Sequence, residues 1–237
     1  MLPIYAPSWV MPGSVAENAV FLRNKVRGVM LCAFEHAPRL PVELPETRGD
    51  LHWHVHLPTD LPWEAGGEAA GRAACRIMRQ TKHLHDKATL AVLHPPRAPA
   101  AAPLKDFLRV WRAEGLPGET LILENLPETE LDALITLTEI MRIGICLDVA
   151  HLALSGNMKH AAANRNRLEA VRMVHWSAPE NGRDAHAPLT AYPVRDQIVC
   201  RELARQFPHA ADVIEIFDWP GVRASWELLR AWRETTP

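Results

Sequence analysis

The chain has 237 residues, of which 48% are hydrophobic, and its formal net charge is −2. That length fits a single domain, 1–237, with a sizeable core. A charge so close to zero provides no broad positive surface, so we expect no nucleic acid partner. Apolar runs fall well short of the ~20 residues that cross a membrane, and the N-terminus shows no signal-peptide pattern. We therefore expect a cytoplasmic protein without membrane contact. The sequence does not indicate its oligomeric state.

The four cysteines are far apart and each lies within an apolar pattern. They form no Cys-x-x-Cys pair, the spacing that is typical of structural zinc sites and redox motifs. We interpret them as small buried residues in a reducing compartment.

Strand and helix patterns alternate along almost the whole chain, which favours a parallel sheet. Predicted strands lie at 4–8, 28–34, 51–57, 88–93, 119–123, 143–147, 171–175 and 211–217. A capping box at Ser14–Glu17 begins the first helix, and further helices are predicted at 65–84, 104–114, 128–141, 158–170, 194–207 and 222–233. Residues 37–50 show no convincing helix. Eight strands predict an α/β fold, a compact (β/α)8 TIM barrel with a short or irregular second helix.

Polar side chains stand where the apolar runs end. The stretch 144–151, Gly-Ile-Cys-Leu-Asp-Val-Ala-His, begins as a buried strand and closes with Asp148 and His151. Other runs end in the same way, at His56, His94, Glu124, His175 and Glu215. Polar residues at the carboxyl ends of successive strands are typical of the active face of a barrel enzyme.

The polar stretch 177–188, predicted as a loop, adds Asp184-Ala-His186. In an extended segment this spacing places Asp184 and His186 on one side. Loops after the seventh strand of a barrel often bind phosphate. Arg183 is therefore either a phosphate contact or a solvated loop arginine.

Imidazoles and carboxylates together suit Zn, Mn, Fe or Co. A single histidine in a strand is more often a hydrogen-bonded core residue, and we assign His52 and His54 to that class. The whole set, however, exceeds what one ion can use, so we expect two or three divalent ions, with Glu124 as a bridging carboxylate. Clustered ions of this kind are suited to phosphoryl-ester hydrolysis.

Four tryptophans lie just past predicted strand ends: Trp9, Trp63, Trp176 and Trp219. Such rings can line a pocket for a large flat ligand. They can equally form the roof of the core, and the sequence leaves both interpretations open.

The strand-end pattern resembles the apurinic endonuclease family 2 / xylose isomerase-like barrel superfamily. In its endonuclease IV-type members, nine ligands hold three zinc ions. The matching residues in this chain are His56, His94, Glu124, Asp148, His151, His175, Asp184, His186 and Glu215. The resemblance implies one ion at Glu124, Asp148, His175 and Glu215, a second at His56 and His94 that shares Glu124, and a third at His151, Asp184 and His186. It also implies Glu124 or Glu215 as the catalytic carboxylate nearest the attacking water.

Local motifs are similar to the cobamide-remodelling phosphodiesterase branch of that superfamily. They are 7–13 (Pro-Ser-Trp-Val-Met-Pro-Gly), 54–60 (His-Val-His-Leu-Pro-Thr-Asp), 147–151 (Leu-Asp-Val-Ala-His) and 182–186 (Gly-Arg-Asp-Ala-His). This resemblance implies a cobamide substrate, a corrinoid whose phosphoribosyl linkage in the nucleotide loop is hydrolysed, and makes Asp60 a predicted substrate contact. The 37–50 region is shorter than expected for that branch.

Three other functions compete with this interpretation. A sugar isomerase or epimerase would need one ion between Glu124 and Glu215 and has less use for Asp184 and His186. An abasic-site endonuclease would need a basic stripe that the sequence lacks. A metal-containing barrel that carries a corrinoid without turnover is the third.

Overall fold

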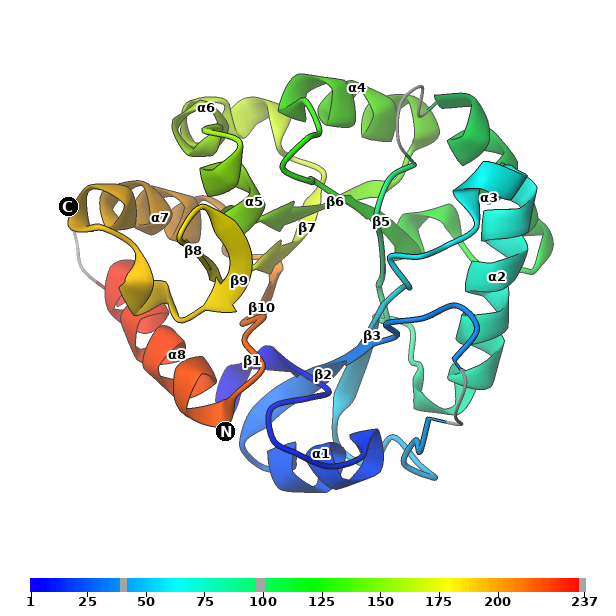
Figure 1. Cartoon of the computed structure of the whole chain (residues 1–237), viewed down its shortest axis with the longest axis horizontal. Coiled ribbons are helices and arrows are strands. Elements are labelled where there is room, and N and C mark those ends of the chain that lie inside the picture. The colour runs from blue at the N-terminus through cyan, green and yellow to red at the C-terminus, as the bar shows by residue number, and fades with distance from the viewer. Residues whose placement is uncertain (39–41, 97–100, 235–237) are drawn as a thin grey trace.

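The computed structural model describes residues 1–38, 42–96 and 101–234. Within these ranges, eight parallel strands close into one barrel in the order β1-β10-β7-β6-β5-β4-β3-β2 (Figure 1). The strands are β1 (Leu2–Pro7), β2 (Val26–Cys32), β3 (His52–His56), β4 (Ala91–Leu93), β5 (Leu121–Glu124), β6 (Gly144–Asp148), β7 (Val171–His175) and β10 (Ala211–Val213). The predicted α/β TIM barrel is confirmed.

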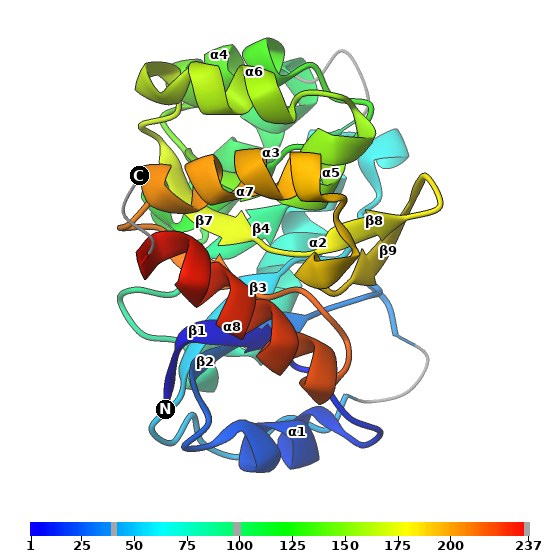
Figure 2. The same ribbon diagram turned by 90° about the vertical axis from the view of Figure 1, so that its left-hand side faces the viewer.

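Helices surround the barrel on its outside (Figures 1 and 2). They are α1 (Val15–Leu22), α2 (Gly67–Gln80), α3 (Ala101–Ala113), α4 (Leu131–Met141), α5 (Val149–Leu154), α6 (Met158–Ala163), α7 (Val194–Gln206) and α8 (Trp219–Glu234). The predicted capping box begins α1: the Ser14 hydroxyl accepts from the Glu17 N–H, and the Glu17 carboxylate accepts from the Ser14 N–H. In the described part of the chain, no helix is both long and apolar enough to span a membrane.

Three connections depart from one helix per strand. Between β2 and β3, the described residues contain no helix, as predicted. After β6, the helix predicted at 158–170 begins at Met158 as α6 but ends at Ala163, followed by a 3-10 turn at Arg165–Arg167, and α5 before it was not predicted. After β7, the predicted polar loop is instead an antiparallel hairpin of β8 (Ala178–Glu180) and β9 (Arg183–Ala187), which projects beyond the barrel in Figure 2.

The hairpin turn has a simple local cause. Asn181 and Gly182 both have positive φ, 52° and 72°, as the two central residues of a type I′ turn require. Asn-Gly between two short strands is the sequence that best favours such a turn. The same sequence signal was therefore present in the stretch that we predicted as a loop.

The core has two layers. Inside the barrel, one cluster is built by Tyr5, Met30, Cys32, Val92, Ile122, Cys146, Met173 and Val213. The His54 ring packs against the Tyr5 ring at 4.2 Å, so His54 belongs to the core as predicted. A second, larger cluster lies between the outside of the strands and the helices. The inner layer fills the barrel, so only the strand ends above it can form a site.

The last helix is fastened to the barrel by the buried carboxylate of Asp212, on β10. Its Oδ1 accepts from Trp176 Nε1 at 2.8 Å and from Arg233 Nη2 at 2.8 Å, and its Oδ2 accepts from Arg233 Nη1 at 2.5 Å. Arg233 belongs to α8, and the rings of Trp176 and Trp232 lie 6.5 Å apart. One carboxylate thus joins β10, the segment after β7 and α8.

Asp212→Ala should lower the free energy of unfolding by about 1–3 kcal/mol, because the buried Trp176 N–H loses its acceptor. Glu227→Ala is the matched control: it removes an exposed ion pair with Arg230 on the same helix and should cost less than about 1 kcal/mol. Urea unfolding followed by circular dichroism measures both. Equal stability of the two variants would contradict this role for Asp212.

Candidate metal centre

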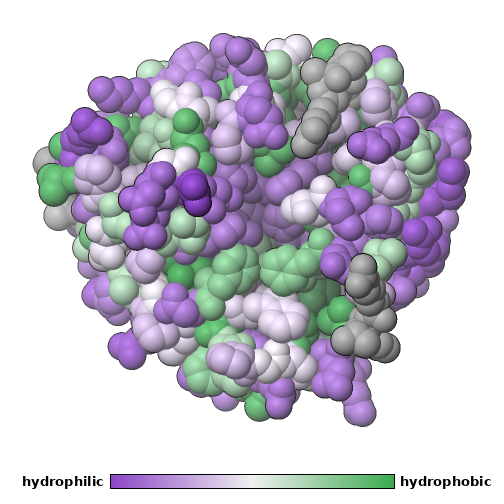
Figure 3. Space-filling view, viewed as in Figure 1, coloured by the Kyte–Doolittle hydropathy of each residue, from purple (hydrophilic) through white to green (hydrophobic). Residues whose placement is uncertain are grey.

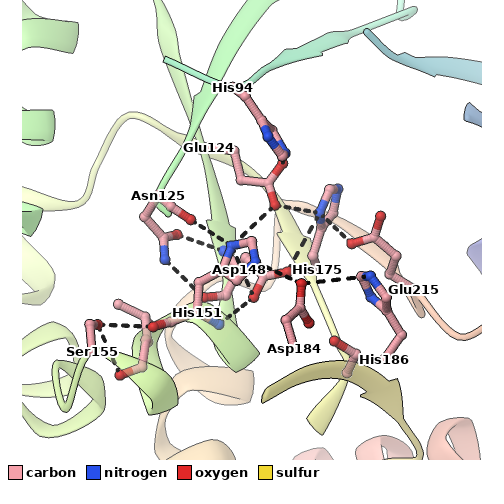
Figure 4. A network of polar contacts seen from close by, with 12 residues as sticks. His94, Glu124, Asn125, Asp148, His151, Ser155, His175, Asp184, His186 and Glu215 are labelled. Carbon is pink, nitrogen blue, oxygen red and sulfur yellow. Dashed lines mark hydrogen bonds and ion pairs between the residues drawn. The ribbon is translucent and has the colours of Figure 1, made fainter. Parts of the chain in front are cut away.

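A cavity of about 210 Å³ opens at the carboxyl ends of the strands. Its imidazole and carboxylate lining comes from six places far apart in the sequence: His56, His94, Glu124, His151, Asp184 with His186, and Glu215. Asp148 and His175 lie beneath them, fully buried. All nine predicted ligands therefore gather at one end of the barrel, and Figure 4 shows most of them facing a common centre.

The two-residue period of a strand explains this convergence. On six strands, the residue two positions before the site residue belongs to the inner layer of the barrel. The pairs are His54 and His56, Val92 and His94, Ile122 and Glu124, Cys146 and Asp148, Met173 and His175, and Val213 and Glu215. Each strand thus places one apolar or neutral side chain in the barrel and the next inward-facing side chain in the site.

The first ligand group consists of His56, His94 and Glu124, whose ligand atoms all lie within 4.8 Å of one another. Glu124 Oε2 is 3.1 Å from His56 Nε2 and 3.2 Å from His94 Nε2. His56 Nδ1 lies 2.9 Å from the Leu57 carbonyl and donates to it. That bond orients the ring so that Nε2 faces Glu124 Oε2, to which it donates at 3.1 Å in the metal-free protein, and an ion that replaces this proton would find a correctly directed ligand.

The second group consists of Glu124, Asp148, His175 and Glu215, again within 4.8 Å of one another. His175 Nδ1 is 2.9 Å from Glu215 Oε2, 3.4 Å from Glu124 Oε1 and 3.8 Å from Asp148 Oδ2. Glu124 therefore faces the first group with one oxygen and the second with the other. A carboxylate placed in this way can bridge two ions.

The third group joins α5 to the hairpin. His151 Nε2 is 3.1 Å from Asp184 Oδ2, and His186 Nε2 is 3.7 Å from the same oxygen. Asp184 and His186 line the same cavity, as predicted, although His186 has a φ of 46° and therefore departs from extended backbone. His151, predicted at a strand end, lies in the first turn of α5, where its N–H donates to the capping carboxylate of Asp148 at 2.6 Å.

Asn125, which the sequence interpretation missed, positions two ligands. Its Oδ1 accepts from the Asp148 N–H at 2.7 Å, and its Nδ2 donates to the Asp148 carbonyl at 3.0 Å. Its own carbonyl accepts from His151 Nδ1 at 2.8 Å, which directs His151 Nε2 to Asp184 Oδ2, the oxygen that accepts from it at 3.1 Å. An amide directly after a strand-end ligand is the signal that could have identified it.

Buried charges of both signs shift the pKa values in this site. Burial works to raise the pKa of Glu124, but the surrounding histidines, His175 first, hold it well below its usual value. In Glu215 the same competition leaves the pKa at about 2. Burial dominates in Asp148 and raises its pKa to about 7. Burial lowers the pKa of His151, but Asp148 and Asp184 outweigh it and raise the value to about 10.

The residues fit divalent ions. Asp148 Oδ2 and both ring nitrogens of His175 are buried without a hydrogen-bond partner. His175 Nδ1 is only 2.9 Å from Glu215 Oε2, yet the two are not aligned for a hydrogen bond. Ligands directed at one common ion have this arrangement. Several charged groups buried together are costly unless something pairs with them, and a set of nitrogen and oxygen donors suits Zn²⁺ or Mn²⁺.

The predicted substrate contacts are only partly brought to the cavity. Trp176 is fully buried and donates to Asp212 behind the strands, so its prediction as a ligand contact is wrong. Trp63 stacks on Phe107 at 5.4 Å and Trp219 packs edge-on against Phe21 at 5.6 Å; neither lines the cavity. Trp9 lies near the mouth, where its ring is 6.1 Å from that of Phe34.

The two polar candidates lie at the rim. Asp60 accepts from the His36 N–H at 2.9 Å and lies 3.1 Å from His36 Nδ1, so it holds the segment after β2 in place. Its neighbour Thr59 lines the cavity. Arg183 is exposed at the start of β9, opposite Glu180. Both stay predictions as substrate contacts.

The lining also contains residues that the sequence interpretation missed, namely Cys32, Phe34 and Phe217. Their signal is the same two-residue period. Phe34 follows Cys32 by two positions, and Phe217 follows Glu215 by two. Each extends an inward-facing row past its last recognised residue.

No protein-family model matches the chain, and no curated protein matches it. Solved structures do share its fold. A "D-tagatose 3-epimerase-like protein" matches with a TM-score of 0.71 and 16% identity, over 98% of this chain and 97% of that chain. "SacUVDE" matches with a TM-score of 0.64 and 12% identity, over 99% and 100%. At such identities the likeness shows the barrel fold, and the activity has to be argued from the site.

Metal binding should release protons and tighten as the pH rises. The raised pKa of His151, about 10, means that His151 is protonated at neutral pH in the metal-free protein, and an ion must displace that proton to reach Nε2. Lowering the pH from 8 to 6 should therefore weaken Zn²⁺ binding. Calorimetry in two buffers of different ionisation enthalpy measures the protons released.

His151→Gln should release fewer protons than the wild type. His160→Gln, which changes an exposed histidine on α6, should release as many. An affinity that is independent of pH, with no proton release, would contradict the proposed ligand role of His151.

Proposed function

We propose that this protein is a metal-dependent phosphodiesterase. The observation that carries the proposal is that three ligand groups lie together at one end of the barrel. Glu124 belongs to two of them and faces each with one of its oxygens. The third consists of His151, Asp184 and His186. Clustered divalent ions would neutralise the charge of a phosphodiester and provide a nucleophilic water at neutral pH. The likeness to the apurinic endonuclease family 2 / xylose isomerase-like superfamily in strand-end pattern supports the same conclusion.

The chain's own residues would hold the ions and orient the attacking water. His56 and His94 with Glu124, then Asp148, His175 and Glu215, and then the third group, would hold the ions. Glu124 and Glu215 line the cavity, and their lowered pKa values keep them ionised at neutral pH. Either carboxylate can therefore accept a hydrogen bond from a water in the cavity and orient it for attack. Asn125 would keep Asp148 and His151 in register during turnover.

We propose a cobamide as the substrate, with the phosphoribosyl linkage of its nucleotide loop as the bond hydrolysed. The 54–60 motif supports this, because it contributes His56 to the site, Thr59 to the lining and Asp60 to the rim. The cavity, at about 210 Å³, is smaller than the ~300–1,000 Å³ usual for whole ligands. It suits a nucleotide loop that enters while the corrin ring stays outside.

A sugar epimerase is the second candidate, because Glu124 and Glu215 face each other across His175 and the "D-tagatose 3-epimerase-like protein" has the same barrel. One ion between two glutamates would be enough for that chemistry. It leaves His56, His94 and the third group without a task. We therefore prefer the phosphodiesterase.

The test is anaerobic incubation with adenosylcobalamin and Mn²⁺ or Zn²⁺, followed by chromatography of the corrinoid. We expect release of the lower-ligand nucleoside, blocked by a chelator. The double variant Asp184→Asn/His186→Ala should lose at least about 100-fold in kcat/KM, since loss of outer-shell partners alone costs ~10–100-fold.

The matched control is Asp132→Asn/His160→Ala, which removes an exposed Asp–His pair with atoms 3.4 Å apart and should keep full activity. Unchanged corrinoid with fully metallated protein would sink the cobamide proposal. Ketose epimerisation that survives in the Asp184/His186 variant would establish the second candidate instead.

A further inference from the structure

Three aromatic rings form a continuous surface beside the candidate metal centre. Phe34 lies 6.1 Å from Trp9 and 6.2 Å from Phe217, with both ring pairs tilted by 52°. We call Trp9, Phe34 and Phe217 the aromatic wall. They come from the segments after β1, β2 and β10, which are neighbours in the barrel. The wall is therefore a product of the fold rather than of one stretch of sequence.

The wall gives the mouth of the cavity two different sides. Figure 3 shows hydrophobic residues gathered over β1, β2 and β10, and hydrophilic residues across the hollow from them. The same cavity is also lined by the polar side chains of His151 and Asp184. A ligand bound here would place an apolar part on one side and a charged part on the other.

Phe34 is 54% exposed, which is unusual for a ring that folding alone would bury. Other exposed large apolar side chains, such as Val20 on α1 and Ile140 on α4, lie on outer helices and line no described cavity. Phe34 instead lines the same cavity as Glu124 and Glu215. Its open face is thus directed to the volume that a substrate would occupy.

The wall also touches the ligand groups. The rings of His186 and Phe217 meet edge to face at 4.9 Å, with planes at 89°. Phe217 follows Glu215 by only two residues. A planar group stacked on Phe34 and Phe217 would consequently lie next to ions held by the third group and by Glu215.

From this geometry we infer that the aromatic wall binds a planar heteroaromatic base that is joined through a sugar to the phosphodiester. The inference rests on the proposed phosphodiesterase function and specifies its substrate further. The wall, rather than the metal ligands, would select substrates with such a base next to the bond that breaks. Phe34 and Phe217 would be specificity-determining residues, and Trp9 would support Phe34 from behind.

The test compares two ligands that differ only in the base. The metal-loaded protein is titrated with the ribose 3-phosphate nucleotide of dimethylbenzimidazole and with ribose 3-phosphate alone, by calorimetry. Stacking of one base on aromatic side chains is worth roughly 5-fold or more in affinity, so the nucleotide should bind at least that much more tightly. Phe34→Ala should remove the difference and leave ribose 3-phosphate binding unchanged.

Two further variants separate stacking from general damage. Phe34→Tyr keeps the ring and should keep the preference for the nucleotide. Val20→Ala, the control on α1, should bind both ligands like the wild type. In turnover of the cobamide, Phe34→Ala should raise KM by the same factor and leave kcat within about 2-fold, as expected when binding to ground state and transition state is lost equally.

The outcomes distinguish the wall from the proposed function. Equal binding of both ligands by the wild type, or an unchanged preference in Phe34→Ala, would overturn the inference even if the enzyme hydrolyses cobamides. Base-dependent binding lost in Phe34→Ala, in a protein that hydrolyses no phosphodiester, would support the wall and refute the proposed function.

Discussion

The site depends on one buried carboxylate, that of Glu124. It is 1% exposed and lies within 3.5 Å of ring nitrogens from His56, His94, His151 and His175. These residues come from different strands and from α5, so Glu124 links the whole carboxyl face of the barrel. Burying several carboxylates together would be too costly without histidines to pair with them. The fold brings carboxylates and histidines together, but Asp148 Oδ2 and both ring nitrogens of His175 still have no hydrogen-bond partner. A divalent ion at this centre would pair with these atoms.

Few sequence positions are needed to build this centre on a barrel. Each of six strands places one side chain in the inner layer and the next inward-facing one in the site, so two positions per strand define both core and chemistry. The hairpin and α5 then add what strands cannot, a third group at the rim. The aromatic wall completes the mouth by the same two-residue rule, through Phe34 and Phe217. Core, metal centre and proposed substrate surface therefore share one periodicity.

The sequence predicted the fold class and the nine residues that meet at one end of the barrel, because both follow from local patterns, namely alternating elements and polar residues at strand ends. The sequence interpretation was wrong where the outcome depended on which way a side chain points. Trp176 directly follows the inward-facing His175, so it points outward to α8, whereas Phe217, two residues after Glu215, points inward. Trp63 and Trp219 begin helical segments and pack on neighbouring helices. The hairpin was missed although Asn181-Gly182 favoured it, and α5 was missed because it is only six residues long.

The most direct test of the account is a count of bound ions by elemental analysis, after the protein is purified in the presence of Zn²⁺. The wild type should hold two or three ions per chain. Glu124→Gln should lose the ions of the first two groups, and Asp184→Asn should lose only that of the third. Glu119→Gln, at the opposite end of β5 and exposed, should change nothing. A single ion that persists in Asp184→Asn and in His56→Ala would contradict the three-group centre and favour the epimerase.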